Sequence, residues 1–403
     1  MSFPYIKQIH VNDCYTYQNF DVPANMLTEF KHIILTGKNG TGKTTILNAI
    51  GFQIGALQNA PSGLHKQHHL NSMLKQQGRY VVVENKPEDK VINPYNVLNL
   101  LFLQENNTHA LLNIDEYIFS HFRAHRKVSL DIVNTVLQEE EFVKSLKTQN
   151  DPEKFISKFK QYLVNKKVYE AFDLMKNNKT RLDQNQLFFN NLRDILQRIF
   201  EDAKLELEFI QESFEFELVL GDGRHITFNQ LSEGFSAFIS ILMDLLMRVD
   251  LIRKEKGDYS FDPPGIALID EPETHFHIGM QYEILPILTE LFPKIQFIVA
   301  THSPAVISSI KNAVVYDLTS KTEVAGWQAG SSYSELMIKH FGLENEFSPV
   351  ADAIIQEVNN AVNERNPEKL REIIMANEKY MTPSLKFEIE NQIIAIESKQ
   401  GLI

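Results

Sequence analysis

Unbroken runs of apolar residues predict three buried strands in this chain. The runs occupy residues 32–36, 266–269 and 295–300. Strands covered on both faces of a parallel sheet have this continuous pattern, because neither side of the strand meets water. Residues 279–292 have the apolar content and length of a helix between the last two runs, and parallel neighbours need such a crossover. The pattern therefore predicts an α/β fold built around a βαβ unit.

Other periodicities predict a hairpin and a long helix in the second half of the chain. Residues 214–220 largely alternate between apolar and acidic side chains, and Gly221-Asp222-Gly223 leads into residues 225–228. This pattern is typical of two antiparallel strands joined by a tight turn. From Phe235 to Val249 apolar residues recur at helical spacing, so a helix follows the hairpin. Strand-like runs in the first third of the chain lie at 80–83, 100–103 and 117–126.

The chain divides into four predicted segments, two of which are helical. Between residues 129 and 200 there is no Gly and one Pro, Pro152, which is typical of an inserted helical arm. Beyond residue 330, three pairs of an N-cap residue followed by Pro each predict the start of a helix. These pairs are Ser348-Pro349, Asn366-Pro367 and Thr382-Pro383. The segments are an N-terminal lobe at 1–128, the helical insertion at 129–204, a C-terminal lobe at 205–330 and a small helical appendage at 331–403.

Glycines follow the first buried strand in a pattern that binds phosphate. Residues Gly37 to Thr44 match G-x-x-x-x-G-K-[ST], and the apolar residues after them continue as a helix. Glycine permits a backbone whose successive N–H groups converge on an anion, and the helix N-terminus adds partial positive charge. Lys43 is expected to reach the β and γ phosphates of a nucleotide. The candidate nucleotide-binding residues are Asn39, Gly40, Thr41, Gly42, Lys43, Thr44 and Thr45.

Acidic residues end the second buried strand, and a histidine lies just after the third. Asp270 and Glu271 would meet His302 at one edge of the sheet, because parallel strands share their carboxyl ends. Phosphoryl transfer needs charge neutralisation and an oriented water rather than covalent work. We expect Asp270 and the hydroxyl of Thr44 to hold Mg²⁺. Glu271 is expected to polarise the attacking water as the catalytic base, and His302 to sense the γ-phosphate.

Other polar residues could contribute to a metal site. Gln104 ends an apolar run and could reach the Mg²⁺ across the site, although a glutamine after a strand is usually solvated. Two groups of histidines invite a zinc site, but neither comes with a full ligand set at recognised spacing. The first group, His275 and His277, is expected to line a subunit interface instead. The second group is His65, His68 and His69.

Charge limits the classes of partner. The 40 basic and 52 acidic residues give a net charge of -12, so the surface as a whole repels nucleic acid and anionic membranes. Any DNA contact must be a local patch. One basic cluster that could track a phosphate backbone contains Arg123, Arg126 and Lys127. A second cluster, for which a solvated helix face is the better interpretation, contains Lys154, Lys158, Lys166 and Lys167.

Cysteine content and the N-terminal residues indicate where the protein works. The single cysteine, Cys14, cannot form an intramolecular disulfide, which is typical of a reducing compartment. The first residues lack a basic stretch followed by an apolar run, and no window approaches the roughly 18 apolar residues of a membrane span. We therefore expect a cytoplasmic protein without a membrane partner.

Four motifs follow one another in the order of a known class of ATPase. They are Gly37 to Thr44, Leu231-Ser232-Glu233-Gly234, Ile266 to Glu271 and Thr301-His302. This set resembles the ABC-class ATPase head found in SMC, RecF and overcoming-lysogenisation-defect (OLD) proteins. Residues 268–273 and 300–304 are most similar to the compact OLD-like ATPases of bacterial anti-phage systems, such as PtuA of Septu. The resemblance covers about residues 1–60 and 205–320.

The resemblance implies a fold, cofactors and an assembly. The fold would be a P-loop NTPase head with two lobes and mixed β-sheets, which binds ATP with Mg²⁺ and works as a dimer or a higher even assembly. In that class the Leu-Ser-x-Gly segment of one subunit closes on the nucleotide held by the other, so Ser232 and Gly234 would act in trans. Glu233 stands where the class usually has Gly or Asp, and its carboxylate near the γ-phosphate would slow closure.

The resemblance also implies a function. OLD nucleases carry a C-terminal Toprim domain with a metal-binding Glu and an Asp-x-Asp pair, for which residues 320–403 offer no convincing equivalent. We therefore expect an ATP-driven dimeric switch of a defence complex that controls a separate nuclease or toxin effector. The alternative is a RecF-like or SMC-like ATPase that binds DNA in repair or recombination. A transporter ATPase is disfavoured, because Lys43 and Ser232 are 189 positions apart, further than in that class.

Overall fold

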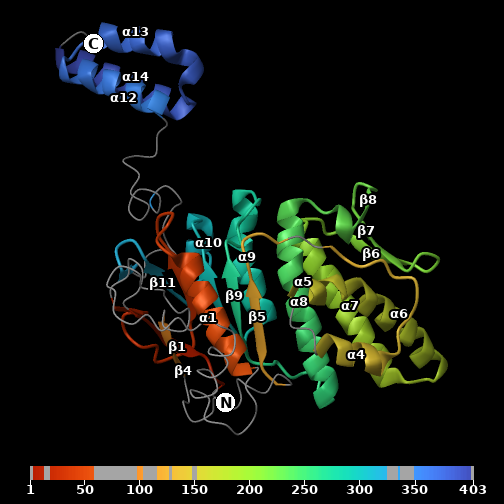
Figure 1. Ribbon diagram of the computed structural model, residues 1–403. Coiled ribbons are helices and arrows are strands. Elements are labelled where there is room, and N and C mark those ends of the chain that lie inside the picture. The colour runs from red at the N-terminus through yellow and green to blue at the C-terminus, as the bar shows by residue number, and fades with distance from the viewer. Residues whose placement is uncertain are drawn as a thin grey trace. The chain divides into compact units, whose positions relative to one another are not determined.

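The computed structural model describes most of the chain as two compact units, residues 1–331 and 332–403 (Figure 1). The described residues are 3–12, 19–58, 98–102, 116–126, 129–147, 152–324, 335 and 349–400. Each unit has a hydrophobic core of its own. The strand predicted at 80–83 lies outside the described residues.

A six-stranded sheet forms the centre of the first unit. In spatial order its strands are β12 (Thr322–Glu323), β11 (Ala313–Asp317), β3 (His32–Thr36), β10 (Ile295–Ala300), β9 (Gly265–Asp270) and β5 (Ile118–Phe122). From β11 to β5 all neighbours are parallel, so their carboxyl ends share one edge. Every residue of β3, β9 and β10 is buried, which confirms the three strands predicted from continuous apolar runs.

The predicted βαβ unit is confirmed. Helix α9 (Ile278–Leu291) connects β9 to β10, begins after the N-cap His277 and contains Pro286. The two strands pair in parallel along their whole length, and the register places Asp270 opposite Ala300. The chain therefore leaves both strands at the same level, which brings the segments that follow them together.

A small antiparallel sheet and helix α1 complete the core of the first unit. The sheet has the order β2 (Phe20–Val22), β1 (Ile6–Val11) and β4 (Leu98–Phe102), and α1 spans Lys43–Gln58. Gln296 is fully buried on β10 and joins the two sheets: its Oε1 accepts a hydrogen bond from the Ile6 amide (2.8 Å), and its Nε2 donates to the Ile6 carbonyl (2.9 Å). One hydrophobic cluster contains residues of β1, β3, α1, β9 and β10.

The segment predicted to be a helical arm is helical from residue 139 onward. Its helices are α4 (Glu139–Lys147), α5 (Pro152–Ser157), α6 (Phe159–Met175) and α7 (Lys179–Ile199). The prediction of a helix from residue 129 is wrong for 129–138, because side-chain amides bind the backbone there. The Asn165 amide pairs with both backbone groups of Leu137, and the Asn229 amide does the same for Leu130. These contacts replace the hydrogen bonds that a helix would supply.

A third sheet and the longest helix follow the arm. The sheet consists of β6 (Glu206–Ile210), β7 (Glu215–Val219) and β8 (His225–Thr227), and β7 and β8 form the predicted hairpin. Strand β6 was not expected, although acidic and apolar side chains alternate from Glu206 to Phe209; none of its residues is buried. After a 3₁₀ turn at Phe228–Gln230, helix α8 spans Glu233–Lys256, with Ser232 at its N-cap as predicted.

The second unit is a small helical bundle. It contains α12 (Pro349–Asn363), α13 (Pro367–Asn377), a 3₁₀ turn at Glu378–Tyr380 and α14 (Pro383–Gln400). All three helices begin at the prolines that predicted them. Asn366 and Thr382 accept capping hydrogen bonds from the amides of Lys369 (3.1 Å) and Leu385 (3.2 Å). The core consists of apolar side chains that the three helices share.

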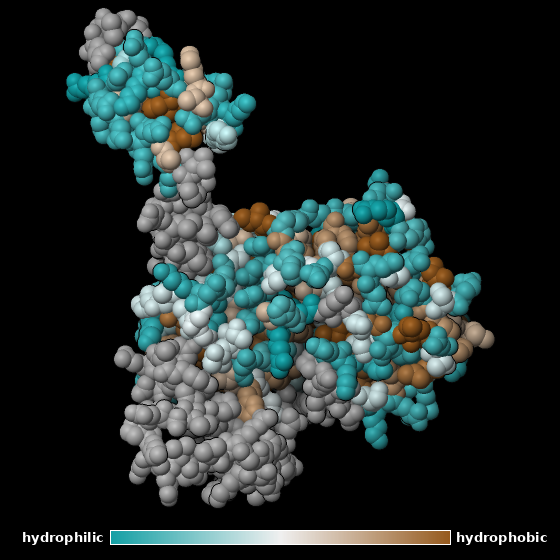
Figure 2. Space-filling model, turned by 45° about the horizontal axis from the view of Figure 1, so that its top comes forward, coloured by the Kyte–Doolittle hydropathy of each residue, from teal (hydrophilic) through white to brown (hydrophobic). Residues whose placement is uncertain are grey.

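On the face shown in Figure 2, hydrophilic residues predominate and hydrophobic ones form separate small groups. Among the described helices, none combines the length and the apolar character that crossing a membrane requires.

Candidate active site

The parallel strands deliver the predicted site residues to one edge of the sheet. Strand β3 leads into the glycine loop 37–42, β9 into Glu271, and β10 into His302. The three glycines of the loop have φ values of 133°, 81° and 88°, in the region that side chains disfavour. Glycine is therefore required for the loop to turn back over the end of β3 and start α1 at Lys43.

The side chain of Lys43 lies against the loop that precedes it. Its Nζ donates to the carbonyls of Gly37 (2.9 Å) and Lys38 (3.3 Å), and only 6% of the residue is exposed. Burial lowers the pKa of Lys43, while the negative charges of Glu271 and Asp270 act in the opposite direction. The loop thus carries a cation beside its amides, which is the arrangement that binds phosphate. Thr41 closes the loop through its Oγ1, which donates to the Lys38 carbonyl (2.9 Å).

The end of β11 braces the glycine loop. The Oγ1 of Thr319 accepts a hydrogen bond from the Lys38 amide (2.9 Å), and Asp317 accepts one from the Thr319 amide (2.8 Å). A Cβ on Gly37 would lie 2.9 Å from that Oγ1, so the loop and the brace fit closely. Sequence reasoning missed this contact, although the polar Asp317-Leu318-Thr319 directly follows an apolar strand and could have suggested it.

Thr44 and Asp270 meet as predicted for a magnesium site. The Thr44 hydroxyl donates to Asp270 Oδ2 (2.8 Å) across 226 positions of sequence. Asp270 Oδ1 is buried and has no partner among the described residues, and burial raises the pKa of this carboxyl. A hydroxyl beside a carboxylate with a free oxygen is the hard oxygen donor set that Mg²⁺ prefers, so these residues fit that ion. Gln104, the third predicted ligand, lies outside the described residues.

Backbone contacts hold Glu271 in an uncommon conformation. Its φ is 47°, in the left-handed region. Its amide donates to the Ala300 carbonyl (2.8 Å), and its carbonyl accepts hydrogen bonds from Thr274 Oγ1 (2.9 Å) and Arg126 Nη2 (3.0 Å). The backbone of the predicted catalytic carboxylate is therefore anchored on both sides.

His302 lies beside the same group of charges. Burial lowers its pKa, and the positive charge of Lys43 lowers it further, while Glu271 has the opposite effect. The backbone amide of His302 is bound by the side chain of Glu273, which sequence reasoning did not single out. A histidine kept neutral beside the phosphate loop can exchange hydrogen bonds with a phosphate oxygen or a water.

Members of both predicted basic clusters are engaged in contacts within the chain. Arg126 donates to backbone carbonyls at the end of β9, so its guanidinium is not available to a phosphate backbone. Lys127 lies outside the described residues. In the second cluster, the expectation of a solvated helix face is only partly right, because three members pair with carboxylates. The pairs are Lys158 with Asp131, Lys166 with Asp250 and Lys167 with Glu170.

The signature residues Ser232 and Gly234 lie at the N-terminus of α8. Ser232 is exposed and does not cap the helix through its side chain. Gly234 is buried, and a Cβ there would lie 2.7 Å from the carbonyl oxygen of His275. Close packing against the segment after Glu271 therefore requires glycine at position 234. This requirement comes from within the chain and does not depend on a second subunit.

The two histidines after Glu271 have roles other than a zinc site. His277 caps α9 by accepting a hydrogen bond from the Met280 amide, and His275 lies 3.4 Å from the carboxylate of Glu233. In the described part of the chain, no group of three or more His, Cys, Asp or Glu side chains could hold a metal ion. His65, His68 and His69 lie outside that part.

An open cleft of about 1050 Å³ lies beside the Thr44 and Asp270 pair. One wall is the N-terminal part of α1, which includes Thr45, and the other is the end of β5 with the segment after it. His121 belongs to that wall. Burial lowers the pKa of His121 to about 4, and the positive charge of Arg123 makes a smaller contribution in the same direction. The cleft gives solvent and ligands access to the predicted metal position.

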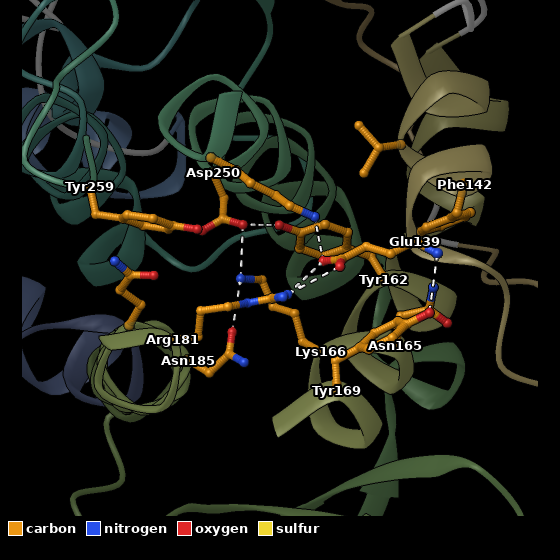
Figure 3. Close-up of a pocket in the computed structure, with 13 residues that line it drawn as sticks. Glu139, Phe142, Tyr162, Asn165, Lys166, Tyr169, Arg181, Asn185, Asp250 and Tyr259 are labelled. Atoms are coloured by element: carbon orange, nitrogen blue, oxygen red, sulfur yellow. Dashed lines mark hydrogen bonds and ion pairs between the residues drawn. The ribbon is translucent and has the colours of Figure 1, made fainter. Parts of the chain in front are cut away.

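A second cavity, between the arm and α8, is too small for a nucleotide. Its volume is about 30 Å³. As Figure 3 shows, charged and phenolic side chains fill its surroundings: Asp250 lies between Tyr162 and Lys166, and Arg181 reaches Glu139. These contacts join α6 to α8 and α7 to α4, so the cavity belongs to the packing of the arm.

A family model described as "AAA domain, putative AbiEii toxin, Type IV TA system" matches residues 33–308. The match includes the glycine loop, the Asp270 and Glu271 pair and His302. Among solved structures, the Smc head domain with an extended coiled coil bound to the C-terminal domain of ScpA, derived from Pyrococcus furiosus, is similar with a TM-score of 0.38. Its sequence identity is 13%, and the likeness covers 80% of this chain and 95% of that chain.

Known relatives of the chain include Septu and retron proteins of bacteria. Septu protein PtuA of Bacillus mycoides (strain KBAB4) is 24% identical over 310 residues, which are 74% of this chain and 38% of that protein. Septu protein PtuA of Bacillus thuringiensis is 26% identical over 186 residues, 43% of this chain and 47% of that protein. "Retron Ec83 probable ATPase" of Escherichia coli is 37% identical over 87 residues, 22% of this chain and 16% of that protein. The chain spans less than half the length of each relative.

Proposed function

Since the chain belongs to the family described as "AAA domain, putative AbiEii toxin, Type IV TA system", we propose that it is an ATP-hydrolysing dimeric switch of an anti-phage defence complex. The switch would control a separate effector subunit, a nuclease or a toxin. The observation that carries the ATPase part is the meeting of Thr44 and Asp270, with Glu271 and His302 beside them, at the mouth of a glycine loop.

The residues at the sheet edge have separate tasks in hydrolysis. The loop amides and Lys43 would bind the β and γ phosphates of ATP. Mg²⁺ held by Thr44 and Asp270 would neutralise phosphate oxygens. Glu271 would orient a water and accept its proton while the water oxygen bonds to the γ-phosphorus and the bond to the β–γ bridging oxygen breaks. His302 would contact the γ-phosphate and distinguish ATP from ADP.

The switch part of the proposal rests on two subunits closing on ATP. Ser232 stands exposed at the start of the 24-residue α8, so its hydroxyl is accessible to a second copy. Glu233 beside it would bring a carboxylate to the same surface, which favours slow rather than rapid closure. Slow hydrolysis suits a switch, because the closed state then persists long enough to act on a partner.

The defence part rests on the named relatives. Two are Septu proteins and one is a retron ATPase, so a role in anti-phage defence is the one that they support. A separate effector is proposed because the described residues of the second unit form a bundle of three helices and contain no group of carboxylates and histidines that could hold a catalytic metal. The ion-paired lysines of the arm count against a DNA-binding repair ATPase.

The experiment that tests the switch is a mass measurement by light scattering with and without Mg-ATP. Glu271→Gln should retain ATP and rise to a dimer or a multiple of it, since binding persists while water activation is lost. Lys43→Ala is the matched control and should neither bind ATP nor change mass. A Glu271→Gln protein that binds ATP and stays monomeric would contradict the switch. A wild-type chain without ATP binding would contradict the ATPase.

A further inference from the structure

Arg126 binds the backbone of Asp270, the predicted metal ligand, and of Glu271, the predicted catalytic base. Its Nη1 donates to the carbonyl of Asp270 (2.6 Å), and its Nη2 donates to the carbonyl of Glu271 (3.0 Å). A planar guanidinium holds two acceptors with donors fixed in one plane, whereas the three donors of an ammonium rotate freely. We propose that Arg126 is a positioning residue for ATP hydrolysis, which fixes the direction of the Glu271 side chain by clamping these two carbonyls. This inference rests on the proposed ATPase function.

The fold explains why a residue 144 positions away reaches Asp270. Strand β5 is the parallel neighbour of β9, and the register places Phe122 opposite Ile269. The chain after β5 therefore turns over the end of β9. Arg126 Nη1 also donates to the carbonyl of Arg123, which closes this turn and directs the guanidinium at the strand end.

The surroundings of Arg126 indicate a fixed cation rather than a mobile surface charge. Its Nε is buried and has no hydrogen-bond partner among the residues that the structure describes. Burial lowers the pKa of Arg126 to about 10, while Glu273, Asp270 and Glu271 act to raise it. The group is therefore charged at neutral pH. Its charge also acts to lower the pKa of Asp270, which helps to keep that carboxylate ionised for a metal.

Glu271 needs a restraint because its backbone is strained. Residues other than glycine rarely adopt the left-handed region, and Glu271 has a φ of 47°. The hydroxyl and the backbone amide of Thr274 share the Glu271 carbonyl with Arg126, so two contacts to Glu271 remain after the arginine is removed, whereas the Asp270 carbonyl loses its Arg126 contact. Without the clamp on Asp270 and Glu271, the backbone can relax and the catalytic carboxylate can turn away from the attacking water.

The clamp should affect hydrolysis more than ATP binding. The predicted phosphate contacts belong to the loop between β3 and α1, whereas Arg126 acts on the end of β9. A misplacement of about 1 Å at a reacting group can cost about 100-fold in rate. We expect Arg126→Ala to lower kcat by about 30-fold to 100-fold and to change KM and the affinity for ATP less than about threefold.

The experiment compares Arg126→Ala, Arg126→Lys and a control, Arg224→Ala, in the same steady-state and ATP-binding assays. Arg224 is exposed in the turn between β7 and β8 and pairs with Asp222, so its removal should leave kcat unchanged. Arg126→Lys keeps the charge but reaches one carbonyl, so its kcat should fall between those of wild type and Arg126→Ala. Methylguanidinium should restore part of the kcat of Arg126→Ala, since it refills the clamp.

Three results would overturn the inference. They are an unchanged kcat in Arg126→Ala, a loss of ATP affinity as large as the loss of kcat, and no gain from methylguanidinium in a folded Arg126→Ala protein. If Arg126→Ala does not fold, Arg126→Lys carries the test, and full activity of that variant overturns the clamp. The wild-type protein in the same assay distinguishes failure of the Arg126 inference from failure of the ATPase proposal. A wild type that binds ATP without hydrolysing it contradicts the ATPase proposal and not the inference about Arg126.

Discussion

Glu273 Oε1 accepts a hydrogen bond from the backbone amide of His302 (2.9 Å) and a second one from Thr301 Oγ1 (2.7 Å). The carboxylate thus links the segment after β9 to the segment after β10. Its other oxygen is buried and has no partner within the described ranges, and burial raises the pKa of Glu273. The position of His302 at the candidate site depends on this link.

Removal of the Glu273 carboxylate should displace His302. In Glu273→Ala the amide of His302 loses its acceptor, which costs about 1–3 kcal/mol for a buried group. We expect kcat to fall at least about tenfold and the free energy of unfolding to fall by about 1–3 kcal/mol. Glu273→Gln keeps an acceptor oxygen and should stay near the wild-type kcat. Equal kcat values for both variants would contradict the link.

The contact between Gly234 and His275 predicts a stability difference between two helical glycines. A Cβ at Gly234 would lie 2.7 Å from a backbone oxygen, whereas a Cβ at Gly55 in α1 meets nothing within 4 Å. Gly234→Ala should therefore destabilise the protein by about 1–3 kcal/mol. Gly55→Ala should stabilise it by up to about 1 kcal/mol, because alanine favours helix. Urea unfolding checks both values, and a neutral Gly234→Ala would mean that α8 and His275 separate easily.

His32 should make stability fall at acidic pH. The residue is 4% exposed, its Nδ1 accepts a hydrogen bond from the Phe297 amide (3.1 Å), and burial lowers its pKa from 6.5 to about 4. The unfolded chain therefore takes up a proton near pH 6.5, before the folded one does. The stability that the neutral ring provides is present above pH 6.5 and is lost as the pH falls, by about 2 kcal/mol between pH 7 and 5.

A substitution isolates this contribution. His32→Asn keeps an acceptor and does not titrate, so the loss of unfolding free energy between pH 7 and 5 should be smaller than in wild type by about 2 kcal/mol. Chemical unfolding at the two pH values measures it. If the two proteins lose the same free energy, the His32 ring does not resist protonation in the folded state.

The hydrogen bond by which Thr319 braces the glycine loop should increase the affinity of the loop for nucleotide. Thr319→Val keeps the shape but removes the acceptor for the Lys38 amide, so the loop loses one contact that sets its conformation. We expect the affinity for Mg-ATP to fall about tenfold, which is about 1.4 kcal/mol and within the range of one hydrogen bond. Thr319→Ser keeps the hydroxyl and should bind ATP as wild type does. Titration calorimetry distinguishes the two, and unimpaired binding by Thr319→Val would rule out the brace.

Local signals along the sequence were enough to predict most of the elements and to predict which residues meet at the carboxyl edge of the central sheet. The glycine loop between a buried strand and a helix predicted where phosphate binds, and each proline after an N-cap residue in the tail began a helix. The rule that parallel strands share their carboxyl edge also predicted that Asp270 lies near Thr44, and the two side chains are hydrogen-bonded in the structure. Such features depend on backbone sterics and on apolar periodicity, which neighbouring residues determine.

Only the tertiary structure decided which side chains hold the candidate site residues in place. In the sequence nothing distinguishes Arg126 from other basic residues, Glu273 from other acidic residues or Thr319 from other hydroxyl residues. The fold places each of them against a backbone group. Their partners lie 144, 29 and 281 positions away. A hydrogen bond to a backbone carbonyl or amide requires no particular residue at the other end, so no sequence pattern records it. The same reason explains the error at 129–138, where distant amide side chains, not helical periodicity, satisfy the backbone.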